Sequence, residues 1–215
     1  MRNIVYTSII LHNMILEDSG RAFCGESYDE GVNFIYGRRY LTISTATDVP
    51  LLYKAHKRIH GFPGMLGSLG CTHWEWPTCL TAWKGQHHGG NHDSPTLILQ
   101  ANASQDLWIW HAYFGMAGAK NDIAVLQSSN NFNDVIDGVA PYTSLYANDV
   151  EYMYGYYLVD DIYPEWAMFV KSFSCPDDVK RLYLKKKKKL TRKDVERAFG
   201  VLKKMVYHCP AVEDT

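Results

Sequence analysis

The strongest hydrophobic pattern in this chain runs from residue 192 to residue 206. Apolar side chains recur there at intervals of three and four residues, which predicts an amphipathic helix with one buried stripe. The stripe consists of Val195, Ala198, Phe199, Leu202, Met205 and Val206. Thr191 is expected to start this helix, with Asp194 completing a box-like start signal. Glu196 falls on the shoulder of the stripe, one turn before Gly200.

A glycine inside a helix costs about 1 kcal/mol relative to alanine. Gly200 therefore suggests a close approach of backbone or ligand one turn beyond a half-buried Glu196 carboxylate. The alternative is an ordinary surface helix in which the glutamate pairs with a nearby lysine or arginine.

Weaker patterns divide the rest of the chain into further helices and strands. The other expected helices are residues 3–16, 48–60, 121–129 and, leading into the late helix, 176–189. The expected strands are residues 65–76, 96–103, 107–115 and 152–160, with a tight turn at 104–106. This order, three antiparallel strands, a helix, a strand and a helix, is compatible with one mixed α/β domain.

Length and composition favour a single globular body. The chain has 215 residues, of which 47% are hydrophobic, enough for one domain with a real core. We expect residues 1–22 to hold a first helix, residues 23–45 a loop-rich connection and residues 46–215 the main domain. The first helix should pack on the core and cover its apolar side chains, which are Ile4, Val5, Ile9, Leu11 and Ile15. Five cysteines at irregular spacing indicate reduced thiols in an intracellular protein rather than a disulfide framework.

The charge balance excludes a global basic field. The net charge is −1 and the pI is near 6.7, so any nucleic-acid contact must depend on local patches. No membrane association is expected. The first sixteen residues hold an apolar run after Arg2, but polar residues interrupt it and it is too short to span a bilayer.

Lysines mark the candidate nucleic-acid contacts. The run LKKKKKL spans residues 184–190 and predicts phosphate contacts or nuclear targeting, with a solvated helix face as the alternative. Lys84, beside a tryptophan in TAWKGQ, and Lys203 on the late helix are further candidates. The lysines of the run are Lys185, Lys186, Lys187, Lys188 and Lys189. The cysteines and histidines of residues 71–92 fit no paired zinc spacing.

Several long strings resemble one known family. They are HGFPGMLGSLGCTHWEW at 60–76, TAWKGQ at 81–86, DLWIWHAYFGMAGAKNDIAVLQSS at 106–129, GYYLVDDIYPEWAMFVKSF at 155–173 and RKDVERAFGVLKK at 192–204. In this order they resemble successive motifs of the PIF/Harbinger-type transposases and their plant descendants. The resemblance covers about residues 40–206. Residues 3–16 resemble a segment that in this family follows the late helix, whereas here it comes first.

The resemblance implies a ribonuclease H-like α/β fold with a central sheet and flanking helices. It also implies a metal-dependent DNA endonuclease in which three carboxylates hold Mg²⁺ or Mn²⁺, because these hard ions prefer oxygen ligands. Glu196 matches the third acidic position. Asp160 matches the second and lies 36 residues before it, while Asp161 replaces a glycine of the family pattern. Asp122 matches a further acidic position, with a helix cap as its alternative role.

The first acidic position is occupied by Gly70, where the family motif GSIDCMHW reads GSLGCTHW in this chain. A glycine side chain cannot bind a metal, so we expect weak metal binding and an impaired or inactive nuclease. The expected partners are DNA and a nuclear protein that supplies DNA recognition, and the expected location is the nucleus, with the cytoplasm as the alternative. Two other interpretations stay open, a non-enzymatic domesticated binding or scaffold protein and a non-functional transposon fragment.

Overall fold

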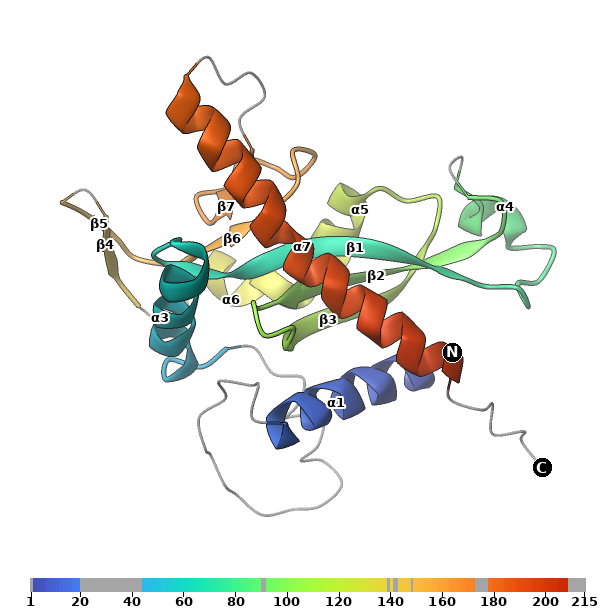
Figure 1. The fold of residues 1–215 in the computed structure, drawn as a ribbon. Helices are drawn as coiled ribbons and strands as arrows, with labels where there is room; N and C mark the ends of the chain where they lie inside the picture. The colour runs from blue at the N-terminus through green and yellow to red at the C-terminus, as the bar shows by residue number, and fades with distance from the viewer. Residues whose placement is uncertain are drawn as a thin grey trace.

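The structure is a computed structural model built around one twisted sheet (Figure 1). It describes residues 2–19, 44–89, 92–138, 140, 143–147, 149–172 and 178–208. The expected loop-rich connection at 23–45 therefore lies almost wholly outside the described residues. A long helix crosses one face of the sheet, and two short helical segments lie toward the opposite face (Figure 1).

The sheet has five strands in the order β3-β2-β1-β6-β7. The strands are β1 (Met65–Glu75), β2 (Thr96–Ala103), β3 (Ile109–Ala117), β6 (Tyr156–Leu158) and β7 (Phe169–Val170). Strands β1, β2 and β3 pair antiparallel, whereas β6 runs parallel to β1 and β7 parallel to β6. The mixed α/β fold predicted from the sequence, a central sheet with flanking helices, is confirmed.

Strand boundaries differ from the prediction in the third and fourth strands. Leu107 has a positive φ of 71°, which interrupts the extended backbone, so β3 begins at Ile109. The aromatic run predicted as one strand over 152–160 is divided. Its first residue ends β5 (Val150–Tyr152), which pairs only with β4 (Leu145–Ala147), and its centre forms the short β6.

The late helix α7 is one continuous helix, Val179–His208. The prediction that Thr191 starts it is wrong. Thr191 is buried in mid-helix and its hydroxyl donates to the backbone carbonyl of Lys187 at 3.1 Å. Lysines are good helix formers, and within α7 neither glycine nor proline occurs before Gly200. Nothing therefore ends the helix between the lysine run and the residues that follow Thr191. Asp194 does not form a capping box, because it pairs with His60 and Arg197.

Helix α7 packs its apolar stripe on the sheet, chiefly on β1. Val195, Ala198, Phe199 and Leu202 are buried in the largest core cluster together with residues of β2 and β3. Full burial of one such side chain stabilises the fold by about 1.5–3 kcal/mol. The predicted stripe is therefore confirmed, although the helix that carries it is longer than expected.

Helix α1 (Arg2–Asp18) joins the same core and lies against α7 and β3. Val5 and Ile9 are fully buried, as expected. The expectation that Ile4, Leu11 and Ile15 are covered is wrong, because these three side chains lie on the outer face of the helix and are exposed. A narrow stripe of buried apolar side chains is enough for α1, because polar contacts also hold the helix on the sheet.

These polar contacts join α1 to the edge strand β3. The Asn13 side chain donates to the Ile109 carbonyl at 2.8 Å and accepts from the Ile109 N–H at 3.0 Å. His12 Nε2 lies 2.9 Å from the Leu107 carbonyl, and the Tyr6 hydroxyl accepts from the Phe114 N–H at 3.3 Å. An edge strand exposes unpaired backbone groups, and α1 satisfies several of them here. The polar residues that interrupt the apolar run of the first segment thus fix the helix in place.

The remaining elements connect or cover the sheet. They are α3 (Asp48–His60), α4 (Lys84–His87), α5 (Asp122–Ser128), the 3₁₀ helix η1 (Asn130–Phe132) and α6 (Asn133–Ile136). Helix α3 has the predicted bounds and ends at Gly61 in the left-handed conformation, where L side chains are strained. Within the described residues, no helix combines the length and the apolar character needed to cross a membrane.

Candidate functional site

Asp160 lies just past the end of β6, at the carboxyl end of a central strand. One of its carboxylate oxygens, Oδ1, is 2.7 Å from Nη1 of Arg192 on α7. Burial would raise the pKa of Asp160, but the hydrogen bond and charge of Arg192 outweigh it, so the pKa lies below its ordinary value. Asp160 is therefore a carboxylate held ionised by a cation from the late helix.

Glu196 contacts the same guanidinium. Its Oε1 lies 3.5 Å from Nη2 of Arg192, one helical turn earlier. Both carboxylate side chains keep 57% of their surface exposed, so Glu196 is not the half-buried group that its helix position predicted. Asp160 and Glu196 therefore both contact Arg192, whose guanidinium lies between them.

Asp122 lies on the same rim, in the first turn of α5. Burial, and with it the charge of Asp160, raises the pKa of Asp122, while Arg192 acts in the opposite direction. Asn121, rather than Asp122, caps the helix, because its side chain accepts from the Ala124 N–H at 2.9 Å. The cap interpretation of Asp122 is therefore wrong, and its carboxyl group instead lies beside the Cys71 thiol.

Gly70 lies in the middle of β1, paired with Ala101 of β2. A Cβ built on Gly70 would lie 3.2 Å from Cγ1 of Val195 and 3.7 Å from Phe199, so position 70 faces α7. A side chain here would thus point at the helix that carries Glu196. It would also need Val195 to move by a few tenths of an ångström, which gives any substitution of Gly70 a small packing cost.

The next residue, Cys71, faces the other side of the sheet. Its thiol lies 3.5 Å from the Tyr163 hydroxyl, and burial followed by the charge of Asp122 raises the pKa of Cys71 to about 12. A thiol with this pKa stays protonated at neutral pH and is a poor nucleophile and a poor metal ligand. Asp161 is also engaged, since its carboxylate accepts from the Ser172 N–H at 3.2 Å.

The donor set does not fit the metal centre that the family resemblance implies. A two-ion nuclease site needs three converging carboxylates. Here the first position is a glycine, and Arg192 lies between Asp160 and Glu196. In the described part of the chain, no three histidine, cysteine, aspartate or glutamate side chains are grouped so that they could hold a metal ion.

Two lysines of the predicted nucleic-acid run lie against the body of the domain. Lys188 is only 3% exposed, and burial lowers the pKa of Lys188 to about 8. Lys187 lies over the rings of Phe62 and Tyr183, at 5.6 and 5.8 Å from their centroids. The prediction is wrong for Lys188, because the helix turns every fourth side chain of the run toward the core.

The other predicted lysines differ in exposure. Lys186 and Lys189 are exposed on α7, Lys185 is half-buried, and Lys84 is exposed in the short helix α4. Lys203 lies 5.8 Å from the centroid of the Trp74 ring and is half-buried, so its amine covers an aromatic face.

The structure adds a basic face that sequence reasoning missed. The helical period places four exposed cations on the outer side of α7, namely Lys189, Lys193, Arg197 and Lys204. Gly200 belongs to this face, and among the described residues no atom lies within 4 Å of a Cβ built on it, so its lack of a side chain serves no close approach between those residues. We call these four residues the α7 basic face. We call Asp122, Asp160 and Glu196 the acidic cluster. Glu196 borders the α7 basic face, so the two groups are neighbours.

A histidine pair lies at the far end of β1. His73 Nδ1 is 2.9 Å from the Thr96 hydroxyl, and its ring centroid is 4.1 Å from that of His92. Burial, followed by the charges of His92 and Lys203, lowers the pKa of His73. These contacts make His73 part of the packing around β1.

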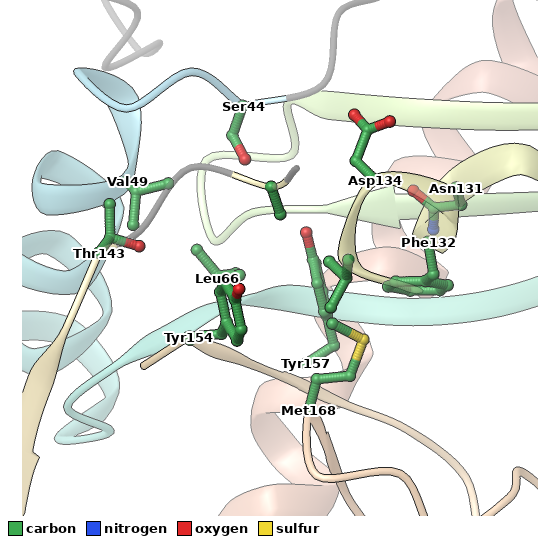
Figure 2. Close-up of a pocket in the computed structure, with 13 residues that line it drawn as sticks. Ser44, Val49, Leu66, Asn131, Phe132, Asp134, Thr143, Tyr154, Tyr157 and Met168 are labelled. Atoms are coloured by element: carbon green, nitrogen blue, oxygen red, sulfur yellow. The ribbon is translucent and has the colours of Figure 1, made fainter. Parts of the chain in front are cut away.

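A separate hollow lies between α3, β1 and the segment around α6 (Figure 2). Val49, Leu66 and Met168 give it an apolar wall, and Asp134 supplies a carboxylate. None of the acidic-cluster residues lines it. It therefore does not serve the chemistry that the sequence predicts.

The family of this chain follows from comparison with known proteins. The model of the family described as plant transposon protein matches residues 38–211. This chain belongs to the plant transposon protein family. The match includes the whole sheet, the acidic cluster and α7, and it begins after α1. No curated protein and no solved structure matches the chain.

Proposed function

We propose that this member of the plant transposon protein family is a DNA-binding domain of Harbinger-type nuclease ancestry that no longer cleaves DNA efficiently. It would act in the nucleus, with a protein partner that supplies sequence recognition. The observation that carries the proposal is the junction of two surfaces on α7, a basic face suited to phosphates and an acidic cluster paired with Arg192 rather than arranged for metal ions.

The support for DNA binding is the charge of α7. Twelve of the 22 lysine and arginine residues of the chain belong to this one helix, which has only two acidic residues, Asp194 and Glu196. The net charge of −1 for the whole chain conceals this separation. A row of exposed cations along one helix face follows a phosphate backbone without reading its sequence.

The support for impaired cleavage is the acidic cluster. Two acidic positions of the family pattern are filled by Asp160 and Glu196, but both contact one guanidinium, and Gly70 offers no third carboxylate. The competing function, metal-dependent cleavage by the unaltered chain, would require Arg192 to leave and another ligand to replace the missing aspartate.

The test of DNA binding is a salt titration. Fluorescence anisotropy with a labelled duplex should give a dissociation constant that rises with salt, because bound phosphates release counterions. Lys189→Gln and Lys193→Gln should each reduce the slope of log K against log salt by about 1. Lys120→Gln, an exposed lysine in the turn before α5, is the matched control and should leave the slope unchanged.

Two results would contradict the proposal. One is the absence of binding at low salt. The other is a slope that Lys189→Gln and Lys193→Gln alter no more than Lys120→Gln does.

A further inference from the structure

The start of α7 extends beyond the sheet (Figure 1). Residues 178–183 are all exposed, so no side of the helix is covered there. Helical spacing places four apolar side chains on one face, and they are Val179 at 82% exposure, Leu182 at 54%, Tyr183 at 64% and Leu190 at 55%. We call these four residues the α7 apolar face. Apolar side chains gathered at one place on a protein surface mark an interaction site.

The surroundings of this face select the kind of partner. Residues 179–190 contain seven basic residues and no acidic one. Pairing of this helix end with the same end of another copy would bring like charges together, which is unfavourable. DNA phosphates would satisfy the lysines but would leave the apolar side chains in water. The partner therefore combines apolar side chains with negative charge.

The β4–β5 hairpin is a surface of that kind on the same chain. Its exposed apolar residues are Tyr146 at 71%, Val150 at 51%, Tyr152 at 51% and Met153 at 60%. Residues 145–153 include Asp149 and Glu151 but neither lysine nor arginine. All three residues of β5 are exposed. A two-stranded ribbon without a covering layer is only marginally stable in water, so this hairpin gains from being covered.

The base of the hairpin is held by the body of the domain. The Tyr53 hydroxyl on α3 donates to the Thr143 carbonyl at 3.1 Å. The Leu145 side chain lies against Gly64, whose φ of 75° and lack of a Cβ leave room for it. The hairpin is thus fixed at its base and presents its strands outward (Figure 1).

We propose that the α7 apolar face of one copy binds the β4–β5 hairpin of a second copy, with Lys186 of the helix facing the acidic groups of the hairpin. Cross-strand pairing puts Tyr146 and Glu151 on the same face of the hairpin, so this face offers an apolar side chain and a negative charge to the apolar side chains and Lys186 of the helix. A two-fold arrangement makes the contact twice and closes the dimer. The α7 apolar face and the α7 basic face meet at Lys189 and Leu190, so the two proposals are separated by variants taken from the far end of each face.

The test is the mass of the full chain in solution, measured by sedimentation velocity across the micromolar range. A concentration-dependent dimer is expected, and its dissociation constant should rise with salt. Glu151→Lys and Lys186→Glu should each raise that constant about tenfold or more, since each places like charges together. The combined variant reverses both charges and should restore association.

Controls separate this interface from folding and from DNA binding. All of the substituted residues are exposed, so circular dichroism should show an unchanged fold. Lys204→Gln, at the far end of the α7 basic face, should weaken DNA binding but not association, and Leu182→Ser should weaken association but not the salt slope for DNA. A monomer at every concentration would overturn the proposal. Failure of the combined variant to restore association would also overturn it.

Discussion

Arg192 determines the character of the acidic cluster. Its guanidinium is 26% exposed and lies between two carboxylates that are more than half exposed. Ion pairs at such exposure contribute little to stability, typically about 0–1 kcal/mol. Their effect on protonation and on competing cations is larger, because a fixed positive charge lowers the pKa of Asp160 and repels a divalent ion at the same place.

Arg192→Gln should therefore raise the pKa of Asp160. The pKa of Asp160 is lowered in the folded chain, so Asp160 contributes stability above its unfolded pKa and loses it as the pH falls through the folded pKa. The variant should lose this contribution at neutral pH and differ little from the parent in acid. The carboxyl pKa followed by NMR, with urea unfolding at neutral and acid pH, measures both effects.

Lys193→Gln is the control for this prediction. It removes the positive charge of the residue that follows Arg192, whereas the ion pairs of Asp160 and Glu196 described above are with Arg192. An Asp160 pKa that moves equally in both variants would show that general field effects, rather than the ion pair, hold the carboxylate ionised.

At the scale of elements, the attachment of α1 to the edge of β3 stands out because it depends on polar side chains. Asn13 is fully buried and pairs with both backbone groups of Ile109. An edge strand that is covered in this way cannot add a strand from another chain.

Asn13→Ala should destabilise the domain strongly. The substitution leaves the N–H and C=O groups of Ile109 without their partner, and an unsatisfied buried group costs about 1–3 kcal/mol. Ile15→Ala removes more apolar surface but from a side chain that is 58% exposed, so its effect should stay within about 0.5 kcal/mol. Urea unfolding of both variants measures the difference, and equal effects would mean that α1 is not held through Asn13.

Element prediction succeeded where hydrophobic periodicity decided the structure. The stripe through Phe199, the helix over 48–60 and the strand over 96–103 were all predictable, because burial imposes their periods. Thr191 was misinterpreted since a threonine before an apolar run resembles a cap, and the sequence does not show that the lysines before it continue the same helix.

Site prediction reached the carboxylates but not their partner. The positions of Asp160 and Glu196 followed from a family pattern, whereas the bridging role of Arg192 depends on where the end of β6 meets α7. The spacing of four residues between Arg192 and Glu196 was the available signal. Burial of Lys188 was missed for a related reason, because a run of identical residues carries no periodicity of its own.

At the scale of the whole molecule, one helix performs three tasks. Its inner side closes the core, its outer side carries the α7 basic face, and its edge supplies Arg192 and Glu196 to the acidic cluster. A side chain at position 70 would press on the inner side of this helix, because Gly70 faces Val195.

Gly70→Asp is the substitution that addresses the acidic cluster directly. It adds a third carboxylate toward α7, while Gly70→Asn adds the same shape without charge. Both variants push on Val195 alike, so their difference isolates the effect of the carboxylate on metal affinity. Combination with Arg192→Gln removes the competing cation.

The most direct test of the account is Mn²⁺ binding by calorimetry, together with nicking of supercoiled plasmid, for the unaltered chain and these variants. We predict no measurable binding or nicking for the unaltered chain and for Gly70→Asn. We predict Mn²⁺ binding for Gly70→Asp, tighter when Arg192→Gln is added, with detectable nicking. Strong metal-dependent cleavage by the unaltered chain would contradict the account.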